Sequence, residues 1–364
     1  MSRRVLQLLG RSAGGIATHV AQITKALDGD GLVVDVACPP GLPVEMPKPA
    51  IPLSIPNGLV GHTGAIRRIR ALVKQGDYDV VHAHGLRAGI DAALGARRQA
   101  TVMVTVHNLV RSEIAGARAR VDRLAEPLVV RLCTRTLAVS EEIASHLRAV
   151  APGAADRIEV LYLGVGEPPE VRRDTAAIRA ELSLGDDDAL IVAVARLAPQ
   201  KALPVMFDAL GRMRSPATLV LLGEGPLENE LRSIAELRGL ADRVHFLGFR
   251  KDAADYVAAA DVFCLSSTWE GVPLSVQEAI LLGTPVVSTD VGGMREIVTD
   301  GVSGRLVPPG RPDALADALD ELCGSPQLRA TLAARARRDL ATRFSTPAML
   351  ERLRALYLED LDAR

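Results

Sequence analysis

Short apolar runs recur along the chain, and each is followed by a segment in which apolar residues return with helical spacing. Strands that are apolar on both faces and alternate with helices are typical of parallel sheets covered on both sides. Two such series occur one after the other, which predicts two doubly wound α/β domains. The first series is RVLQLL, LVVDVAC, DVVHAH, TVMVTVH, TRTLAVS and RIEVLYL, and the second is LIVAVARL, ATLVLLGEG, RVHFLG, DVFCLSS, PVVSTD and GRLVPP.

The two series meet in a segment rich in glycine and proline, residues 163–174 (LGVGEPPEVRRD). A chain of 364 residues is also longer than a single hydrophobic core usually supports. We therefore expect one domain over residues 1–165 and a second over residues 166–346. The last segment, residues 347–364, carries apolar residues at helical spacing and can cap either domain.

The N-terminus and the cysteines indicate where the protein works. The apolar run in MSRRVLQLLGRSAGG soon ends at glycines, which predicts a first strand rather than a signal peptide. No other run approaches the ~18 apolar residues of a membrane span, so we expect a soluble, cytoplasmic protein. Cys38, Cys133, Cys264 and Cys323 show neither CxxC spacing nor a pairing pattern, which indicates reduced thiols and no zinc site.

Charge is distributed unevenly along the chain. Lys and Arg exceed Asp and Glu over residues 1–165, and the reverse holds for the remainder. A positive half can approach anionic lipid or an acidic ligand by long-range attraction, although ordinary surface scatter explains the asymmetry equally well. Residues 111–135 are Arg-rich and partly apolar, which suits either a helix at the inner face of the cell membrane or a solvated helix face.

Nearly every unusual polar residue follows a predicted strand, where open parallel sheets bind their ligands. Gly14 and Gly15 follow the first strand and precede a helix, so the backbone there can approach a ligand closely. His82 and His84 lie two apart at the end of one strand, and His107 ends another. Two imidazoles on one face can bind zinc, but with no accompanying carboxylate or cysteine cluster we favour histidines that hydrogen-bond a ligand.

The second series carries two cations in one loop. Arg196 follows an apolar strand and Lys201 comes five residues later, a pair that can clamp a diphosphate. Gly223 and Gly225 form only part of a dinucleotide-binding turn, because the third glycine and an acidic residue after the next strand are missing. The turn therefore argues against a nicotinamide cofactor and for backbone shaped around a nucleotide base.

The segment WEGVPLSVQEA holds two carboxylates on either side of a bend. Pro273 suits the first turn of a helix, so Glu278 lies in the first turns of that helix and Glu270 at the strand end. Each carboxylate can accept two hydrogen bonds from neighbouring hydroxyls, as on a sugar or a ribose. Free N–H groups near Leu274 and Ser275 would face a phosphate between them.

Taken in order, these motifs resemble the retaining glycosyltransferases of family 4. The resemblance rests on GGIATHV, on Arg196 and Lys201 in R-x4-K spacing and on Glu270 and Glu278 in E-x7-E spacing, with GTPVVSTDVGG and DGVSGRLVPPG in addition. It covers essentially the full length. It implies the GT-B fold, two Rossmann-like domains facing across a cleft, with the final helix, residues 347–364, returning to the N-terminal domain.

The resemblance also implies roles for particular residues. Arg196 and Lys201 would neutralise the donor diphosphate, Glu278 would hold the ribose and Glu270 the transferred sugar. His107 would lie close to the reacting sugar and act with Arg196, Lys201 and Glu270 in catalysis. The remaining expected contacts are Gly14, Gly15, Gly225, Val272, Pro273 and Leu274 with the donor, and His19 and His84 with the acceptor.

The expected reaction moves a hexosyl group from a UDP- or GDP-sugar to an acceptor hydroxyl, with retained anomeric configuration. The product would be a glycolipid, an exopolysaccharide or another glycoconjugate, or alternatively a natural product or small-thiol precursor, and the acceptor can be lipid-linked. No cofactor, obligatory metal or nucleic acid is expected, and no DxD triad is present. Two departures from the family pattern affect loop shape: Ala202 replaces a glycine, and Leu163 an asparagine.

Several other classes stay open. A paired-carboxylate hydrolase would use the two glutamates as acid and base, and a GT-B epimerase would admit water to the same site. A binding module that keeps the fold without activity would be free to lose its cations and carboxylates. A metal hydrolase would be built on His82 and His84.

Overall fold

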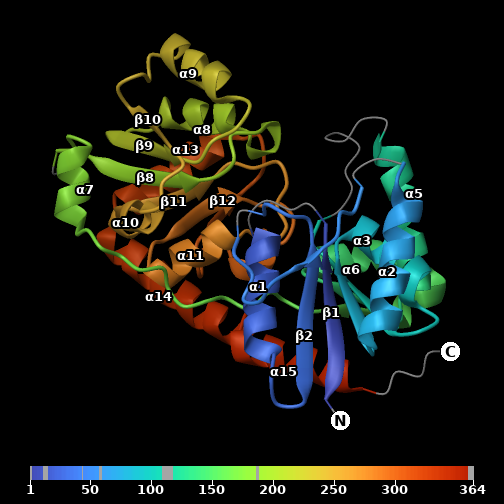
Figure 1. Cartoon of the computed structure of the whole chain (residues 1–364). Coiled ribbons are helices and arrows are strands. Elements are labelled where there is room, and N and C mark those ends of the chain that lie inside the picture. Colours follow the sequence, from blue (N-terminus) through green and yellow to red (C-terminus); the bar gives the residue numbers. More distant parts are fainter. Residues whose placement is uncertain are drawn as a thin grey trace. The chain divides into compact units, whose positions relative to one another are not determined.

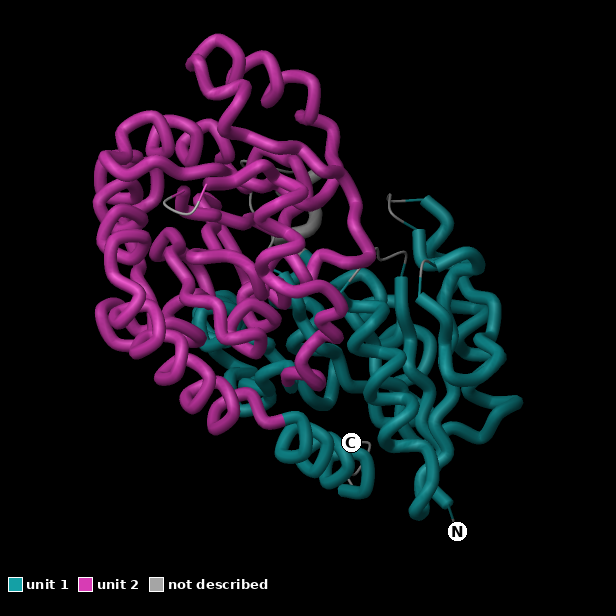
Figure 2. The backbone as a smooth tube through the Cα atoms, turned by 90° about the vertical axis from the view of Figure 1, so that its left-hand side faces the viewer, with its two compact units in different colours: residues 1–164, 346–364 teal, residues 165–345 magenta. Residues whose placement is uncertain are grey.

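The computed structural model describes residues 2–10, 15–42, 44–56, 60–108, 118–185 and 188–359. Gly14 and residues 111–117 of the Arg-rich segment lie outside the described residues, as do the side chains of residues 118–124. The chain forms two compact units, Met1–Gly164 with Thr346–Arg364 and Val165–Ser345 (Figure 2). None of the described helices combines the length and the hydrophobicity that a membrane span requires.

The first unit is built on a parallel sheet with the strand order β3-β2-β1-β4-β5-β6-β7. Figure 1 shows two of its strands, β1 and β2, side by side. Each central strand is followed by a helix that packs back on the sheet. The strands are β1 (Arg3–Leu9), β2 (Leu32–Cys38), β3 (Ile51–Pro52), β4 (Val80–His84), β5 (Thr101–Val106), β6 (Arg135–Ala138) and β7 (Ile158–Val160). The helices are α1 (Gly15–Leu27), α2 (His62–Gly76), α3 (Leu86–Ala96), α5 (Arg118–Leu132), α6 (Glu141–Val150), a 3-10 turn (Pro152–Arg157) and α15 (Thr346–Leu358).

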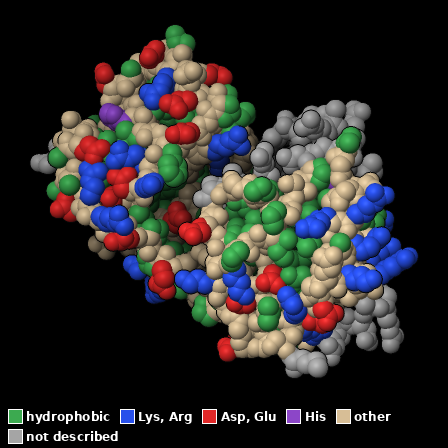
Figure 3. All heavy atoms as spheres, viewed as in Figure 1, with side chains coloured by type: hydrophobic (Ala, Val, Ile, Leu, Met, Phe, Trp, Pro, Cys, Tyr) green, Lys and Arg blue, Asp and Glu red, His purple; other side chains and the backbone are tan. Residues whose placement is uncertain are grey.

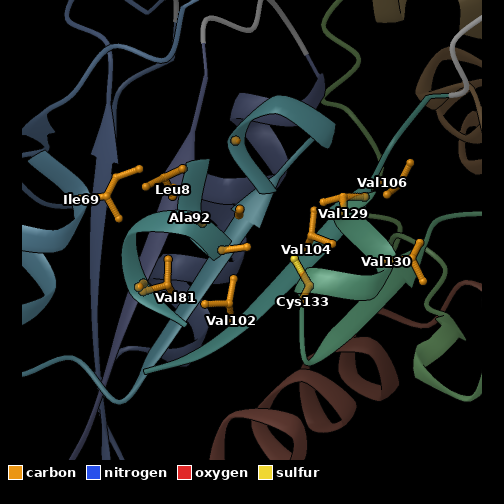
Figure 4. Packing of buried hydrophobic residues seen from close by; sticks show 14 of the residues in the cluster. Leu8, Ile69, Val81, Ala92, Val102, Val104, Val106, Val129, Val130 and Cys133 are labelled. Atoms are coloured by element: carbon orange, nitrogen blue, oxygen red, sulfur yellow. The ribbon is translucent and has the colours of Figure 1, made fainter. Parts of the chain in front are cut away.

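Apolar side chains on both faces of this sheet explain why its strands read as continuous apolar runs. All six residues of β5 are buried. On one face, Val81, Val102 and Val104 pack against Ala92 of α3 and Val129 of α5 (Figure 4). The other face is covered by α1 and α15, whose apolar residues form a separate cluster with those of β1, β2 and β5.

The second unit repeats the plan with the strand order β10-β9-β8-β11-β12-β13. Its strands are β8 (Ala189–Val194), β9 (Ala217–Leu222), β10 (Val244–Gly248), β11 (Val262–Leu265), β12 (Val286–Thr289) and β13 (Arg305–Val307). Its helices are α7 (Thr175–Glu181), a 3-10 turn (Pro199–Lys201), α8 (Leu203–Leu210), α9 (Glu228–Leu237), α10 (Ala253–Ala259), α11 (Leu274–Leu282), α12 (Met294–Ile297), α13 (Pro312–Cys323) and α14 (Pro326–Arg343).

Strand order reverses once in each sheet, between β1 and β4 in the first unit and between β8 and β11 in the second. At such a point the loops leave in opposite directions and open a crevice at the carboxyl ends of the strands, where α/β proteins bind their ligands. The predicted fold class, two doubly wound parallel-sheet domains, is confirmed. Lys and Arg side chains gather along the edge of the first unit that carries α2 (Figure 3), including the exposed Arg67, Arg68, Arg70 and Lys74.

Candidate functional site

The strand-order reversal of the second unit brings Lys201 and Glu270 together. Lys201 ends the short turn after β8, Glu270 follows β11, and these two strands are neighbours in the sheet. The ammonium Nζ of Lys201 donates to Oε1 of Glu270 at 2.6 Å, and the two side chains are only 14% and 6% exposed. Ser267 Oγ donates to the same carboxylate oxygen. A cation and a carboxylate thus stand in contact at the carboxyl edge of the sheet.

The backbone that carries Lys201 is strained at the next residue. Ala202 has φ 44° and ψ 40°, a left-handed conformation that costs an L-residue roughly 1–2 kcal/mol. Ser266 Oγ donates to the carbonyls of Lys201 and Ala202, at 2.9 and 3.2 Å, and helps to hold the turn. This geometry explains why a glycine is usual at this position in the family that the sequence resembles, since glycine adopts it without strain.

The structure does not place Arg196 in the same ion pair. Its side chain is exposed, and it makes no hydrogen bond or ion pair with any described residue. The loop that carries Arg196 packs directly against the turn that contains Gly223 and Gly225. A Cβ at Gly225 would lie 2.2 Å from the carbonyl oxygen of Leu197, so only glycine allows the two loops to approach this closely.

Helix α11 presents the remaining predicted donor contacts. It begins at Leu274, and Pro273 is its N-cap with φ −72° and ψ 124°, one residue earlier than the predicted first turn. As at any helix N-terminus, the amides of Leu274 and Ser275 have no partner inside the helix. Val272 is buried before the helix, and Glu278 is exposed on its second turn. Desolvation by the surrounding atoms raises the pKa of Glu278 above its usual value.

At the strand-order reversal of the first unit, histidine side chains lie together where the second unit has the Lys201–Glu270 ion pair. His84 ends β4 and His107 follows β5, and their rings stack with centroids 5.4 Å apart. His19, from α1, meets both rings edge-on at 6.0 and 5.9 Å. All three are at least nine-tenths buried, and Gly15 begins the helix that carries His19.

Burial keeps these histidines uncharged near neutral pH. Desolvation lowers the pKa of His19 to about 4 and that of His82 to about 3. The pKa values of His84 and His107 are lowered well below 6.5, first by desolvation and then by neighbouring histidines. The cluster therefore offers neutral donors and acceptors to a ligand.

Neighbouring residues occupy both ring nitrogens of His82 and of His84. His82 Nδ1 lies 2.6 Å from the hydroxyl of Tyr357, and its Nε2 lies 2.7 Å from Oγ1 of Thr105. His84 contacts His107 at 3.1 Å and Gln7 at 2.9 Å. Among the described residues, no group of three His, Cys, Asp or Glu side chains could hold a metal ion.

Sequence reasoning missed Gln7, Thr105 and Tyr357, which contact the histidines. A signal was present for two of them, because Gln7 and Thr105 interrupt the apolar strands RVLQLL and TVMVTV. Polar residues in a strand that is buried on both faces need a hydrogen-bond partner. No comparable signal marks Tyr357, which lies in an ordinary helical pattern.

Comparison with known proteins identifies the relatives of this chain. A family model described as Glycosyltransferase Family 4 matches residues 13–166, and one described as Glycosyl transferases group 1 matches residues 174–339. A D-inositol 3-phosphate glycosyltransferase from Xylanimonas cellulosilytica is 32% identical over 89% of this chain and 87% of its own length. An alpha-D-kanosaminyltransferase from Streptomyces kanamyceticus is 29% identical over 66% of this chain and 64% of its own length.

Solved structures share the fold across the whole chain. Anabaena Alr3699/HepE in complex with UDP superimposes with a TM-score of 0.81 at 22% identity, covering 97% of this chain and 99% of that one. Sucrose-phosphate synthase from Thermosynechococcus elongatus gives a TM-score of 0.82 at 23% identity and covers 98% of each chain. The sequence relatives and the shared architecture confirm the predicted resemblance: the chain belongs to glycosyltransferase family 4 and has the GT-B fold.

Proposed function

We propose that this glycosyltransferase moves a hexosyl group from a UDP- or GDP-sugar to an acceptor hydroxyl with retention of configuration. The observation that carries the proposal is the Lys201–Glu270 contact at the strand-order reversal of the second unit. A cation for a diphosphate and a carboxylate for sugar hydroxyls are the two groups that an activated sugar requires side by side. The relatives support a sugar transferred in this way, because solved neighbours of the same fold contain UDP and UDP-glucose.

Lys201 would stabilise the leaving diphosphate. Its ammonium has three donors, and the contact with Glu270 uses one of them. As the glycosidic bond breaks, negative charge grows on the phosphate oxygens, and a fixed cation there favours the transition state over the ground state. Arg196, exposed and unpaired within the described chain, would reach the same diphosphate with its planar fork. The free amides of α11 would add to the positive field.

The two glutamates would hold hydroxyl groups. The contacts of Glu270 with Lys201 and Ser267 both use Oε1, which leaves Oε2 for the transferred sugar. Glu278 would accept hydrogen bonds from the ribose. The family resemblance assigns neither glutamate a proton-transfer role and lets the departing phosphate take the acceptor proton, which is why we favour transfer over paired-carboxylate hydrolysis.

The first unit would supply neutral contacts near the reacting sugar and the acceptor. His107 would hydrogen-bond the sugar, and His19, which makes no side-chain hydrogen bond within the described chain, would face the acceptor. His84 has both ring nitrogens engaged by Gln7 and His107, so a direct contact with the acceptor would cost it one of them. No metal or other cofactor enters this scheme.

The acceptor is either a glycoconjugate, including a lipid-linked one at the inner face of the membrane, or a small polyol. The second candidate is favoured by the relatives named D-inositol 3-phosphate glycosyltransferase. Binding to liposomes of anionic lipid that weakens with added salt would support the first candidate. Transfer to D-inositol 3-phosphate in solution would support the second.

A thermal-shift panel with UDP, GDP and ADP tests the donor, followed by incubation of the matching sugar nucleotides with and without acceptor. The expected result is stabilisation by UDP or GDP and an acceptor-dependent product whose anomeric proton in NMR has the configuration of the donor. An inverted product would overturn retention. Epimerised sugar formed without acceptor would identify an epimerase, and no stabilisation by any nucleotide would overturn the whole proposal.

A further inference from the structure

A continuous chain of buried polar side chains joins the last helix to His107. Gln7 Nε2 lies 2.8 Å from the Tyr357 hydroxyl, and Gln7 Oε1 lies 2.9 Å from His84 Nε2. His84 Nδ1 then lies 3.1 Å from His107 Nε2. These residues are between 0% and 6% exposed. The chain runs through β1, β4 and the end of β5, and every member belongs to the first unit.

For a given orientation of the Gln7 amide, each hydrogen bond in this series of side chains has only one possible donor. The amide oxygen of Gln7 accepts, so His84 Nε2 must carry a hydrogen. A neutral His84 then accepts at Nδ1, and His107 must donate from Nε2. His107 is left with a lone pair at Nδ1. Turning the Gln7 amide over would reverse every bond and leave a hydrogen at Nδ1 instead.

Tyr357 couples the amide to a second series of hydrogen bonds, and in the present placement of the amide each of them has a defined direction. Gln7 Nε2 donates to the Tyr357 oxygen, and the Tyr357 hydroxyl donates in turn to Nδ1 of His82 at 2.6 Å. His82 passes its own hydrogen to Thr105 at 2.7 Å. Tyr357, His82 and Thr105 can each donate or accept, so the amide can turn over only if all of their hydrogen bonds reverse with it. Without the Tyr357 hydroxyl, only the hydrogen bonds among Gln7, His84 and His107 would have to reverse.

We propose that Gln7 and Tyr357 are positioning residues of the glycosyl-transfer reaction, which through His84 keep the hydrogen of His107 on Nε2 and its lone pair on Nδ1. The inference rests on the proposed function, in which His107 contacts the reacting sugar. With the lone pair at Nδ1, His107 accepts a hydrogen bond from a sugar hydroxyl. With the opposite tautomer the direction is reversed, and the hydroxyl would have to accept a hydrogen bond from His107 Nδ1.

The setting favours this role over a contribution to stability alone. Tyr357 lies in an apolar cluster with Leu353, Leu356 and Met103, and its hydroxyl is fully buried. A buried hydrogen-bonded pair can often be replaced by apolar groups of the same shape at little cost. Here several buried polar side chains are hydrogen-bonded in series, and the series ends at the strand-end residue His107. Such a network fixes the orientation of the side chains in it. Tautomer choice at a histidine is set by the hydrogen bond of its other nitrogen.

The test uses the full-length protein and the ring ¹⁵N NMR signals of its histidines at pH 7.5, in wild type, Tyr357→Phe and Gln7→Met. We expect a single Nε2–H tautomer at His107 in wild type and a mixture of tautomers in both variants. Tyr78→Phe is the matched control, since Tyr78 is a buried tyrosine of the same unit whose hydroxyl donates to Asp35 at 2.8 Å. It should leave the His107 signals unchanged.

Kinetics with UDP-glucose provide the functional readout. We expect kcat to fall on the order of tenfold in Tyr357→Phe, the scale seen when partners that orient metal-bound histidines are removed, with KM nearly unchanged. A His107 spectrum that is identical in wild type and Tyr357→Phe, or an Nδ1–H tautomer in wild type, would overturn the inference. If UDP-glucose is not turned over at all, the NMR result still decides the tautomer, and the failure lies with the donor assigned under the proposed function.

Discussion

The two units share one sheet topology but carry different chemical groups at their candidate binding edges. The second unit places a cation and a carboxylate in contact at its strand-order reversal, Lys201 with Glu270. The first unit places a cluster of neutral histidines at the equivalent point, and His84 and His107 belong to it. Topology therefore fixes where a ligand binds, while burial and neighbouring charges decide whether the groups there are ionic or neutral.

Acid should destabilise the first unit earlier than the second. An unfolded histidine titrates near 6.5, whereas in the folded unit the pKa of His19 is about 4 and that of His82 about 3. Above pH 6.5 both states are neutral and the full stability is present. As the pH falls from 6.5 toward these lower values, the unfolded chain gains protons that the folded unit excludes, and stability is lost at roughly 1.4 kcal/mol per pH unit for each histidine.

The second unit carries a later acid transition. Arg250 donates to Asp252 and lowers its pKa to about 2, so the stability from this pair is lost only below about pH 4. Hydrogen exchange measured at stepped pH and corrected for intrinsic rates should show β4 and β5 losing protection at a higher pH than β8 and β9. Simultaneous loss in both units would contradict the comparison.

Removing the cation of the second unit should cost more activity than any other single change there. Lys201→Ala leaves Glu270 without its cationic partner and removes one of the two positive charges proposed for the leaving diphosphate. We expect kcat to fall about a hundredfold or more, a loss of ~3 kcal/mol in transition-state stabilisation. Arg212→Ala removes an exposed cation beyond the end of α8 and should leave kcat unchanged. Equal effects of the two substitutions would show that only general charge matters.

The loop contact behind Arg196 should be intolerant of a methyl group. Gly225→Ala would place a Cβ 2.2 Å from the carbonyl oxygen of Leu197. Overpacking against backbone costs roughly 1–3 kcal/mol, which should appear as a lower urea midpoint for the second unit. Gly211→Ala is the control, because Gly211 has φ −68° and the nearest atom to its added Cβ would be 3.6 Å away. A stable Gly225→Ala protein would remove the steric explanation of the turn.

The smallest effect concerns the strained residue beside Lys201. Ala202→Gly should relieve the left-handed strain and raise the free energy of unfolding by up to about 1 kcal/mol, part of the gain being offset by the freer unfolded glycine. Ala258→Gly, inside helix α10, should instead lower it by about 0.5–1 kcal/mol. Chemical denaturation compares the two, and a loss of stability in both would argue that φ at residue 202 imposes no strain.

Much of the candidate site could be predicted because it sits at strand ends. The apolar runs located Lys201, Glu270, His84 and His107 after strands, and parallel strands bring such residues to one edge. The direct contact between Lys201 and Glu270 could not be predicted from strand positions alone. It depends on β8 and β11 being neighbours in the sheet, although β9 and β10 separate them in sequence. The single-residue shift of Pro273 reflects how weakly local sequence fixes a helix boundary.

The sequence by itself determined the fold class, the family and the kinds of groups at each binding edge, because apolar periodicity and motif spacing are local properties of the chain. Only the tertiary structure decided that Tyr357 meets Gln7, 350 positions away, and that the histidines form one neutral hydrogen-bonded chain. The physical reason is that the apolar face of a helix such as α15 shows that the helix will pack, but not which surface it will pack against. Its partner, and with it the protonation of the buried histidines, is set by the whole fold.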